Sequence, residues 1–407
     1  MEAIKTLRTL MAENRRATPA EQEILSKYVG WGGLANAFDE KKADWAKEYK
    51  QLKNLLSEKE YSSARGSTLN AHYTDVGVIR AIYNGLAGLG FKGGRLLEPS
   101  AGVGHFAGAM PSEFASNTSW TMVELDELTG NIAKYLYPNA DVRVQGFEAA
   151  KIPDNYMDMA ISNVPFGNYA IVDKSYPKAV TGAIHNYFFA KALDKVRPGG
   201  IVTFITSRYT MDAQDSSVRH YIAQRADLLG AIRLPDSAFK GNAGTEVITD
   251  ILILKKREDG TPYAGEQFEN TGWHHQNLSI YEKTNDYFAA HPEMVLGTPA
   301  STGGMYRGNS LTYTAKPGNL QKQIEKAFSS IKGKMDYPAQ VSREKTNFAV
   351  ERASKGTKQN GLVVKDGKVY ADQGVIAGCA GGMFDSIVEA NAILKNGNVG
   401  HDYFSLS

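Results

Sequence analysis

The sequence predicts an α/β protein with a doubly wound, Rossmann-like sheet that is mostly parallel. Through the middle of the chain, short apolar runs bounded by turn residues alternate with segments of helical length, which is typical of parallel strands joined by crossover helices. A turn that contains glycine follows the first run, as in sheets that bind a ligand at their carboxyl edge. The predicted strands are Arg95 to Glu98, Thr121 to Glu124, Val142 to Gln145, Met157 to Ser162, Ile201 to Thr206, Leu228 to Arg233 and Val247 to Leu254.

The last two predicted strands are connected in a different way. The loop from Leu234 to Glu246 has no strong helical period, so it predicts an antiparallel edge in place of another crossover. After Lys255-Lys256-Arg257 the alternation fades and Pro, Gly and Thr become frequent. This change indicates an appended region that follows the sheet.

The N-terminal stretch predicts helices. Ile4, Leu7 and Met11 follow a helical period, and Thr18-Pro19-Ala20-Glu21 is a capping box with proline at the first helical position. We expect this second helix to end at Gly30 and Trp31 to pack as an anchor. The chain is thus divided into a helical region at 1–64, an α/β domain at 65–257 and an appended region at 258–407.

The composition is that of an ordinary globular protein, with 42% hydrophobic and 22% charged residues among 407 and a formal net charge of +2. The longest apolar runs are far shorter than the ~18 residues that a membrane span needs, and no apolar signal core follows the charged N-terminus. One cysteine, Cys379, and eight scattered histidines predict neither an internal disulfide nor a metal site. We therefore expect a cytoplasmic protein that needs no metal.

Basic residues are concentrated in the appended region. From Lys316 to Lys368 there are twelve Lys or Arg and five Asp or Glu. Such a stretch is either a solvated surface or a segment that contacts the phosphates of a nucleic acid. Composition alone does not choose between the two.

The glycine-bearing turn, Leu97 to Phe106, predicts a nucleotide-cofactor loop. Glu124 ends the next strand 20 residues after Gly104, where a carboxylate can hold ribose hydroxyls, and Ala107 replaces the third glycine of a pyrophosphate-binding loop. A cofactor with a ribose but no pyrophosphate, such as S-adenosylmethionine, fits this pattern better than NAD. The alternative is that Glu124 is only a solvated strand end. The candidate residues in the turn are Glu98, Pro99, Ser100, Gly102 and Gly104.

The most specific motif follows the fourth strand, at Asn163-Val164-Pro165-Phe166. The side-chain oxygen of Asn163 and the backbone carbonyl of Val164 can accept hydrogen bonds from an exocyclic amine, while Phe166 stacks on a flat heterocycle. Two such acceptors would stabilise the positive charge that develops on the amine during attack on a methyl group, without a strong general base. The alternative is a plain strand-to-loop turn with a buried Phe166.

With these motifs, residues 65–257 resemble the gamma-type adenine-N6 DNA methyltransferases, in which the cofactor motifs precede the catalytic one and a recognition region follows. The resemblance implies that Thr74, within Asn70 to Asp75, contacts the methionine carboxylate of the cofactor at a helix N-terminus. It also implies that the target adenine is flipped out of the duplex. Residues 258–407 stand where that family has its DNA-recognition region.

Two positions depart from the family pattern. Val164 stands where the first proline usually is, which lowers the rigidity of the loop but keeps the backbone acceptor. At the third motif, Gly146-Phe147-Glu148 replaces the common Asp-Phe. Phe147 can still contact the cofactor adenine, and Glu148 is the candidate for hydrogen bonding to its amino group.

A narrower resemblance covers more of the chain. The stretches Ala17 to Leu34, Leu234 to Val247 and His291 to Gly297 are similar to the methylase part of large methylase and helicase fusion proteins of plasmids, phages and conjugative elements. This similarity implies modification of mobile DNA against host restriction and a helicase region as the partner in a longer polypeptide. No helicase phosphate loop occurs in this sequence, so the chain is expected to be a stand-alone relative or the methylase portion.

Other functions are compatible with the same motifs. Methyltransferases of cytosine N4, of RNA adenine and of protein glutamine use similar loops. A degenerate methylase fold that is retained for DNA binding is the non-enzymatic alternative, and the two departures are its evidence. A degenerate module should not bind S-adenosylmethionine.

Overall fold

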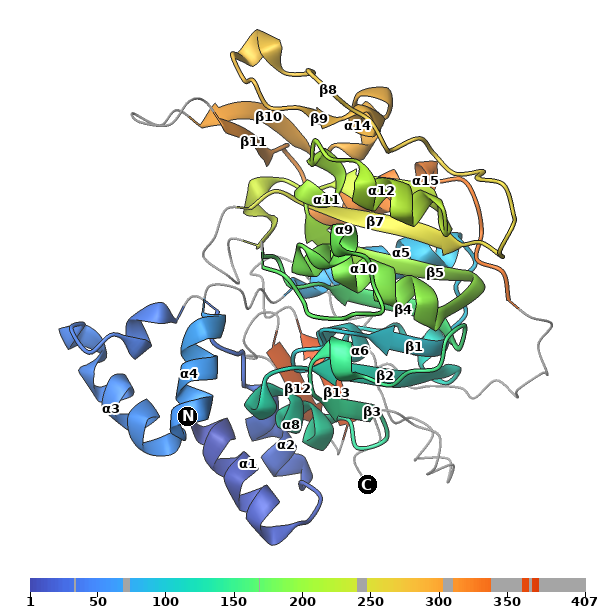
Figure 1. The fold of residues 1–407 in the computed structure, drawn as a ribbon. Helices are drawn as coiled ribbons and strands as arrows, with labels where there is room; N and C mark the ends of the chain where they lie inside the picture. The colour runs from blue at the N-terminus through green and yellow to red at the C-terminus, as the bar shows by residue number, and fades with distance from the viewer. Residues whose placement is uncertain are drawn as a thin grey trace. The chain divides into compact units, whose positions relative to one another are not determined.

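The computed structural model describes residues 1–32, 34–68, 74–167, 169–239, 247–302, 310–337, 361–365 and 368–372 (Figure 1). These residues form two compact units. The first contains the described parts of Met1–Tyr83, Lys92–Ala150 and Gln340–Ser407, and the second contains Asn84–Phe91 and Lys151–Ala339. The first unit holds three parallel strands of the sheet and the second holds four, of which one is antiparallel to its neighbours. This mostly parallel strand set confirms the predicted fold class. The boundaries predicted near residues 64 and 257 remain predictions.

The first unit contributes three parallel strands in the order β3-β2-β1. Their apolar residues are buried on both faces, as in a parallel sheet that is covered by helices. Helix α8 begins at its cap Asp126, whose side chain accepts a hydrogen bond from the backbone N–H of Thr129. The elements are β1 (Gly94–Glu98), α6 (His105–Gly108), α7 (Ser112–Ala115), β2 (Thr118–Glu124), α8 (Glu127–Leu136) and β3 (Asp141–Val144).

The N-terminal helices belong to the same unit. The predicted capping box is present: Glu21 N–H donates to the Thr18 hydroxyl and Thr18 N–H donates to the Glu21 carboxylate. Helix α2 ends at Ser26, earlier than expected, and Gly30 has the positive φ of 66° that a tight turn requires. Trp31 is buried against other aromatic rings. The elements are α1 (Glu2–Glu13), α2 (Pro19–Ser26), η1 (Ala35–Phe38), η2 (Ala43–Trp45), α3 (Ala46–Leu55) and α4 (Glu58–Ser67).

The second unit contributes four strands in the order β4-β5-β7-β6. Strand β4 is parallel to β5, whereas β7 is antiparallel to both β5 and β6. The predicted antiparallel edge is therefore confirmed, with β7 inserted between its neighbours. The elements are β4 (Met157–Asn163), α9 (Lys178–Thr181), α10 (Ile184–Lys195), β5 (Val196–Ser207), α11 (Tyr209–Asp212), α12 (Ser217–Ala223), β6 (Ala226–Arg233), η4 (Asp236–Phe239) and β7 (Thr249–Lys256).

The appended region continues within the second unit. Leu296 N–H donates to the carbonyl of Arg233, which joins this region to the backbone of β6. Strands β10 and β11 form an antiparallel pair. The elements are β8 (Thr271–Gly272), η5 (Gln276–Leu278), β9 (Thr284–Asn285), α14 (Asp286–Ala290), η6 (Pro292–Met294), β10 (Gly297–Thr302), β11 (Ser310–Ala315) and α15 (Leu320–Ser330).

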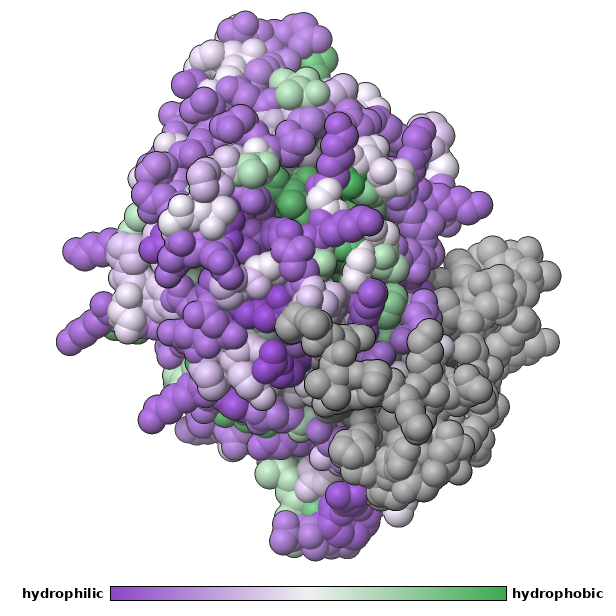
Figure 2. Space-filling view, turned by 90° about the vertical axis from the view of Figure 1, so that its right-hand side faces the viewer, coloured by the Kyte–Doolittle hydropathy of each residue, from purple (hydrophilic) through white to green (hydrophobic). Residues whose placement is uncertain are grey.

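Four further elements complete the described chain: η3 (Phe147–Ala149), α5 (Val76–Gly88) and the antiparallel pair of β12 (Gly361–Lys365) and β13 (Lys368–Asp372). Among the described residues, no helix is both long enough and apolar enough to cross a bilayer. On the face drawn in Figure 2, hydrophobic residues form small patches among hydrophilic ones.

Candidate active site

The predicted cofactor loop lies between β1 and α6, and its backbone is held on both sides. Ala101 N–H donates to the carbonyl of Val123 on β2, at 3.0 Å. Gly104 has a φ of 83°, and the hydroxyl of Tyr137 donates to its carbonyl at 2.8 Å. A Cβ atom at position 104 would overlap the Tyr137 ring. The loop therefore requires glycine at this position for both its conformation and its packing.

The Glu124 carboxylate faces this loop. Its Oε2 accepts a hydrogen bond from Gly102 N–H and its Oε1 accepts one from Asp126 N–H, both at 2.8 Å. Glu98, at the end of β1, is 1% exposed. The structure thus brings together residues that were predicted at two strand ends: Glu98 and Gly102 after β1, and Glu124 at the end of β2.

Burial dominates the electrostatics of these two acids. It raises the pKa of Glu124 to about 7, against the hydrogen bonds from Asp126 and Gly102, which lower it. The pKa of Glu98 is raised well above its usual value, first by burial and then by the charge of Glu124. Among the described residues, Glu98 Oε2 is buried and has no hydrogen-bond partner. The pair can therefore accept hydrogen bonds from ligand hydroxyls or face a cationic ligand.

The other predicted cofactor residues of the first unit lie near the ends of its elements. Thr74 is 3% exposed and precedes α5, whose first turn is capped by Asp75 through a 2.7 Å hydrogen bond from Gly77 N–H. Residues 70–73 of this predicted motif lie outside the described residues. Pro99 is buried and Ser100 is partly exposed.

The altered third motif forms a short 3₁₀ helix after β3, at Phe147–Ala149. Phe147 is 3% exposed, whereas Glu148 is exposed. The Glu148 carboxylate lies against Gly146, where a Cβ atom would overlap it. The predicted roles of Phe147 and Glu148 toward a cofactor stay predictions.

The Asn163 to Phe166 loop lies in the second unit, directly after β4. Val164 N–H donates to the carbonyl of Ile205 on β5 at 3.0 Å, and Val164 is 2% exposed. Asn163, Pro165 and Phe166 are partly exposed, so Phe166 is not the buried core residue of the alternative interpretation. The backbone of the loop is tied to the sheet, and the Asn163 Oδ1 atom is itself buried although the residue is partly exposed.

His185 is a supporting residue that sequence reasoning did not identify. It lies in the first turn of α10 with 5% exposure, and its ring is hydrogen-bonded to the backbone of Gly167 in the loop after Phe166. Burial lowers the pKa of His185 to about 4, so the imidazole is neutral. The Asp173 carboxylate accepts a hydrogen bond from the Tyr187 hydroxyl at 2.7 Å and anchors the loop further along.

Comparisons with known proteins give one related sequence and several distant folds. No protein-family model matches the chain. The Defense against restriction protein B of Escherichia phage P1 is 27% identical over 261 residues, which are 63% of this chain and 10% of that protein. This chain therefore matches only about a tenth of the length of its curated relative.

Two solved structures show the range of the structural similarity. The methyltransferase subunit of a type I restriction-modification system from Streptococcus thermophilus is 16% identical, with a TM-score of 0.40 over 49% of this chain and 48% of that one. The M protein of the type I restriction enzyme EcoKI is 15% identical, with a TM-score of 0.40 over 65% and 62%. These similarities are distant, and the evidence for the fold is the arrangement of this chain's own strands.

Proposed function

We propose that the chain is an S-adenosylmethionine-dependent DNA methyltransferase that modifies N6 of an adenine flipped out of the duplex. The observation that carries the proposal is the Asn163 to Phe166 loop, which follows β4 and is held to β5 by the Val164 N–H. A flipped base is required because the amino group of a stacked, paired adenine is not accessible to the cofactor.

The first unit offers a cradle that fits the proposed cofactor. Glu124 is fixed by the backbone of the loop and can accept hydrogen bonds from both ribose hydroxyls, while the unpartnered Glu98 oxygen offers a further polar contact. S-adenosylmethionine supplies an electrophilic methyl group. We assign the remaining contacts to Thr74, Pro99, Ser100, Phe147 and Glu148.

At the catalytic loop, the chain orients the amine and stabilises its charge. Asn163 Oδ1 and the carbonyl of Val164 accept the two amino hydrogens, and this aligns the nitrogen lone pair for attack. As the nitrogen becomes positive, the same fixed dipoles stabilise it. Phe166, which is partly exposed, stacks on the extruded base.

The biological setting that we propose is modification of mobile-element or phage DNA in the cytoplasm, as part of anti-restriction. The similarity to part of a phage protein named for defence against restriction supports it. A helicase region of a longer polypeptide is the partner that the sequence resemblance implies. Most of the predicted DNA-contacting stretch, Lys316 to Lys368, lies outside the described residues.

The test is methyl transfer from labelled S-adenosylmethionine to unmethylated DNA, followed by chromatography of the nucleosides. N6-methyladenine is the expected product. N4-methylcytosine, or labelled RNA or protein, would point to one of the related amine methyltransferases. Calorimetry with S-adenosylmethionine distinguishes an active methyltransferase from a degenerate methylase fold, which should not bind the cofactor.

A further inference from the structure

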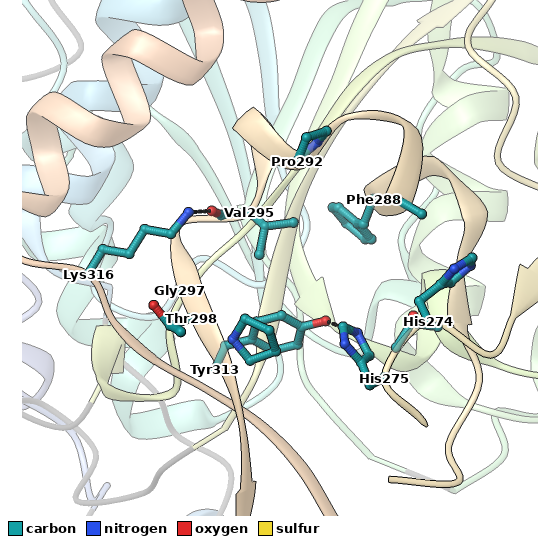
Figure 3. Close-up of a pocket in the computed structure, with 12 residues that line it drawn as sticks. His274, His275, Phe288, Pro292, Val295, Gly297, Thr298, Tyr313 and Lys316 are labelled. Carbon is teal, nitrogen blue, oxygen red and sulfur yellow. Dashed lines mark hydrogen bonds between the residues drawn. The ribbon is translucent and has the colours of Figure 1, made fainter. Parts of the chain in front are cut away.

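A cavity of about 260 Å³ lies in the appended region of the second unit, between α14, η6, β10 and β11 (Figure 3). Its walls are mainly apolar, and Phe288 and Tyr313 contribute aromatic rings. His275 lies next to Tyr313, and Lys316 lies at the end away from the histidine. This volume is at the lower end of small-molecule sites and suits a single ring system.

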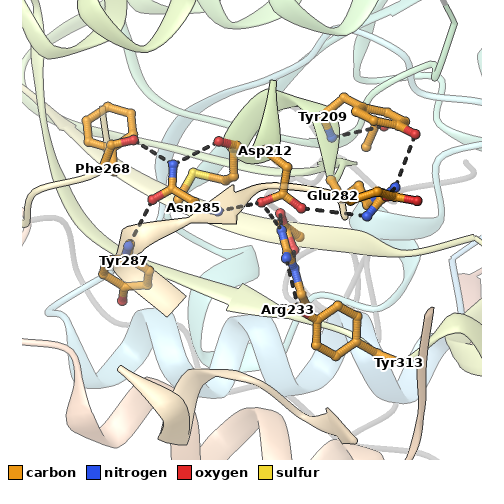
Figure 4. Close-up of polar contacts among 12 residues, drawn as sticks. Tyr209, Asp212, Arg233, Phe268, Glu282, Asn285, Tyr287 and Tyr313 are labelled. Carbon is orange, nitrogen blue, oxygen red and sulfur yellow. Dashed lines mark hydrogen bonds and ion pairs between the residues drawn. The ribbon is translucent and has the colours of Figure 1, made fainter. Parts of the chain in front are cut away.

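A fully buried arginine holds the two aromatic rings in place. The Arg233 guanidinium forms ion pairs with Asp250 at 2.8 Å and with Asp212 at 3.0 Å (Figure 4). Its central carbon lies 4.0 Å from the Phe288 ring centroid and 5.3 Å from that of Tyr313. Both rings are thus fixed by cation–π contact with a group that is itself immobilised, so the site is organised before a ligand arrives.

The same arginine is linked to His275 through the Tyr313 hydroxyl. Arg233 Nη1 donates to the Tyr313 hydroxyl at 3.4 Å, and that hydroxyl is 3.1 Å from His275 Nε2. The Tyr313 hydroxyl donates to Nε2 in one neutral tautomer of His275 and accepts from Nε2–H in the other. Burial, then His274 and Arg233, lower the pKa of His275, which keeps the ring neutral. The pocket therefore has a neutral imidazole beside its aromatic walls.

Cations and exposed aromatic rings occupy the same segments of chain. Lys316 lines the cavity, and its Nζ donates to the carbonyl of Val295 at 2.6 Å. Between β8 and β9, Lys283 lies 5.5 Å from the ring of Trp273, which is 47% exposed, and Tyr281 is 73% exposed. Exposed aromatic rings interspersed with cations are typical of surfaces that bind single-stranded nucleic acid.

We propose that this pocket binds one unstacked nucleobase of a DNA strand, at a site separate from the Asn163 to Phe166 loop. The base lies in the cavity against the apolar wall to which Phe288 and Tyr313 contribute, a polar group of the base hydrogen-bonds with the His275 ring, and neighbouring phosphates lie near Lys283 and Lys316. The inference rests on the proposed action on DNA. A base offers the His275 ring a polar partner that a purely apolar ligand does not.

The test measures binding of a fluorescein-labelled single-stranded oligonucleotide by anisotropy, without cofactor. Thr298 lines the cavity from an exposed position on β10 and has no part in the Arg233 network. Thr298→Trp should fill the cavity and weaken binding about tenfold, since stacking on aromatic side chains contributes ~1 to 3 kcal/mol per base. The matched control is Ser301→Trp, an exposed position on the same strand that does not line the cavity; its affinity should stay at the parent value.

A photo-crosslink locates the base without any variant. An oligonucleotide that carries 5-iododeoxyuridine should crosslink to Tyr313 or Phe288, identified by mass spectrometry. No oligonucleotide binding by the parent chain, equal losses in the two variants, or crosslinks confined to Phe166 would overturn the proposal. The two proposals can fail separately. If Thr298→Trp weakens oligonucleotide binding but the parent chain transfers no methyl group, the pocket proposal stands and only the proposed enzymatic function is contradicted.

Discussion

The carboxylate of Glu124 accepts a hydrogen bond of 2.8 Å from the backbone N–H of Gly102, so the end of one strand is tied to the glycine loop that follows its neighbour. This contact positions an acid that is otherwise costly to bury. It also makes the geometry of the loop depend on a side chain 22 residues further along the chain.

Replacing Glu124 should weaken cofactor binding. Glu124→Ala removes the acceptor assigned to the ribose hydroxyls, and loss of a hydrogen bond to a charged group costs ~1.5 to 3 kcal/mol. Calorimetry with S-adenosylmethionine measures the change. The control is Glu127→Ala, which removes an exposed acid on the same segment whose ion pair with Lys59 is solvent-exposed and contributes little. Equal affinity of the Glu124→Ala variant and the parent chain would remove this ribose assignment.

The raised pKa of Glu124 predicts a stability that falls with pH. In the unfolded chain this acid ionises near its ordinary pKa of 4.5, whereas in the folded chain its pKa is about 7. Between these values the folded state binds more protons, so the free energy of unfolding decreases as pH rises through this window. Thermal unfolding from pH 4.5 to 8 should show a decrease that is smaller in Glu124→Gln. An identical pH profile in that variant would assign the effect to other groups.

Gly104 is predicted to tolerate no side chain. Gly104→Ala places a Cβ at a φ of 83° and against the Tyr137 ring. The left-handed conformation alone costs an L-residue roughly 1 to 2 kcal/mol, so both the unfolding temperature and cofactor affinity should fall. Gly66→Ala is the control, because nothing lies within 4 Å of a Cβ at that position in α4. That substitution should leave cofactor binding intact and stabilise the helix by about 0.5 to 1 kcal/mol.

Val164 shows where sequence reasoning about the candidate site was incomplete. The sequence indicates a loop less rigid than one with two prolines. The structure shows that the Val164 N–H, which proline would lack, donates to Ile205 on the neighbouring strand. Val164→Pro should therefore destabilise the chain by ~0.5 to 1.5 kcal/mol and lower turnover, in place of restoring a family feature. Val164→Ala keeps the N–H and tests the loss of volume separately; higher turnover in Val164→Pro than in the parent would contradict this account.

Sequence patterns predicted the features that depend on a short stretch of chain. The capping box at Thr18 and Glu21, the apolar strands and the placement of Glu124 at a strand end follow from short stretches of sequence. The contact of His185 with Gly167 and the cavity around His275, Phe288 and Tyr313 do not. Both depend on contacts between residues far apart in the sequence or across a loop, and the cavity walls pack around buried Arg233; no periodicity or spacing gives a signal for either.

The last prediction concerns Asn163, the residue proposed to align the attacking amine. Asn163→Ala removes one of two acceptors aimed at the nitrogen, and loss of one preorganised partner in the transition state typically costs ~2.7 to 4 kcal/mol. Turnover should fall about a hundredfold or more. Cofactor affinity should barely change, because the proposed cofactor contacts belong to other residues.

Phe166→Ala is the companion variant, because it tests stacking on the extruded base in place of amine alignment. Its effect should fall mainly on DNA affinity, with a loss of ~1 to 3 kcal/mol for one stacked base. Measuring single-turnover methylation and DNA affinity in both variants separates the two roles. Near-normal methylation by Asn163→Ala, in an assay where the parent chain methylates adenine, would mean that the amine is held by a different loop.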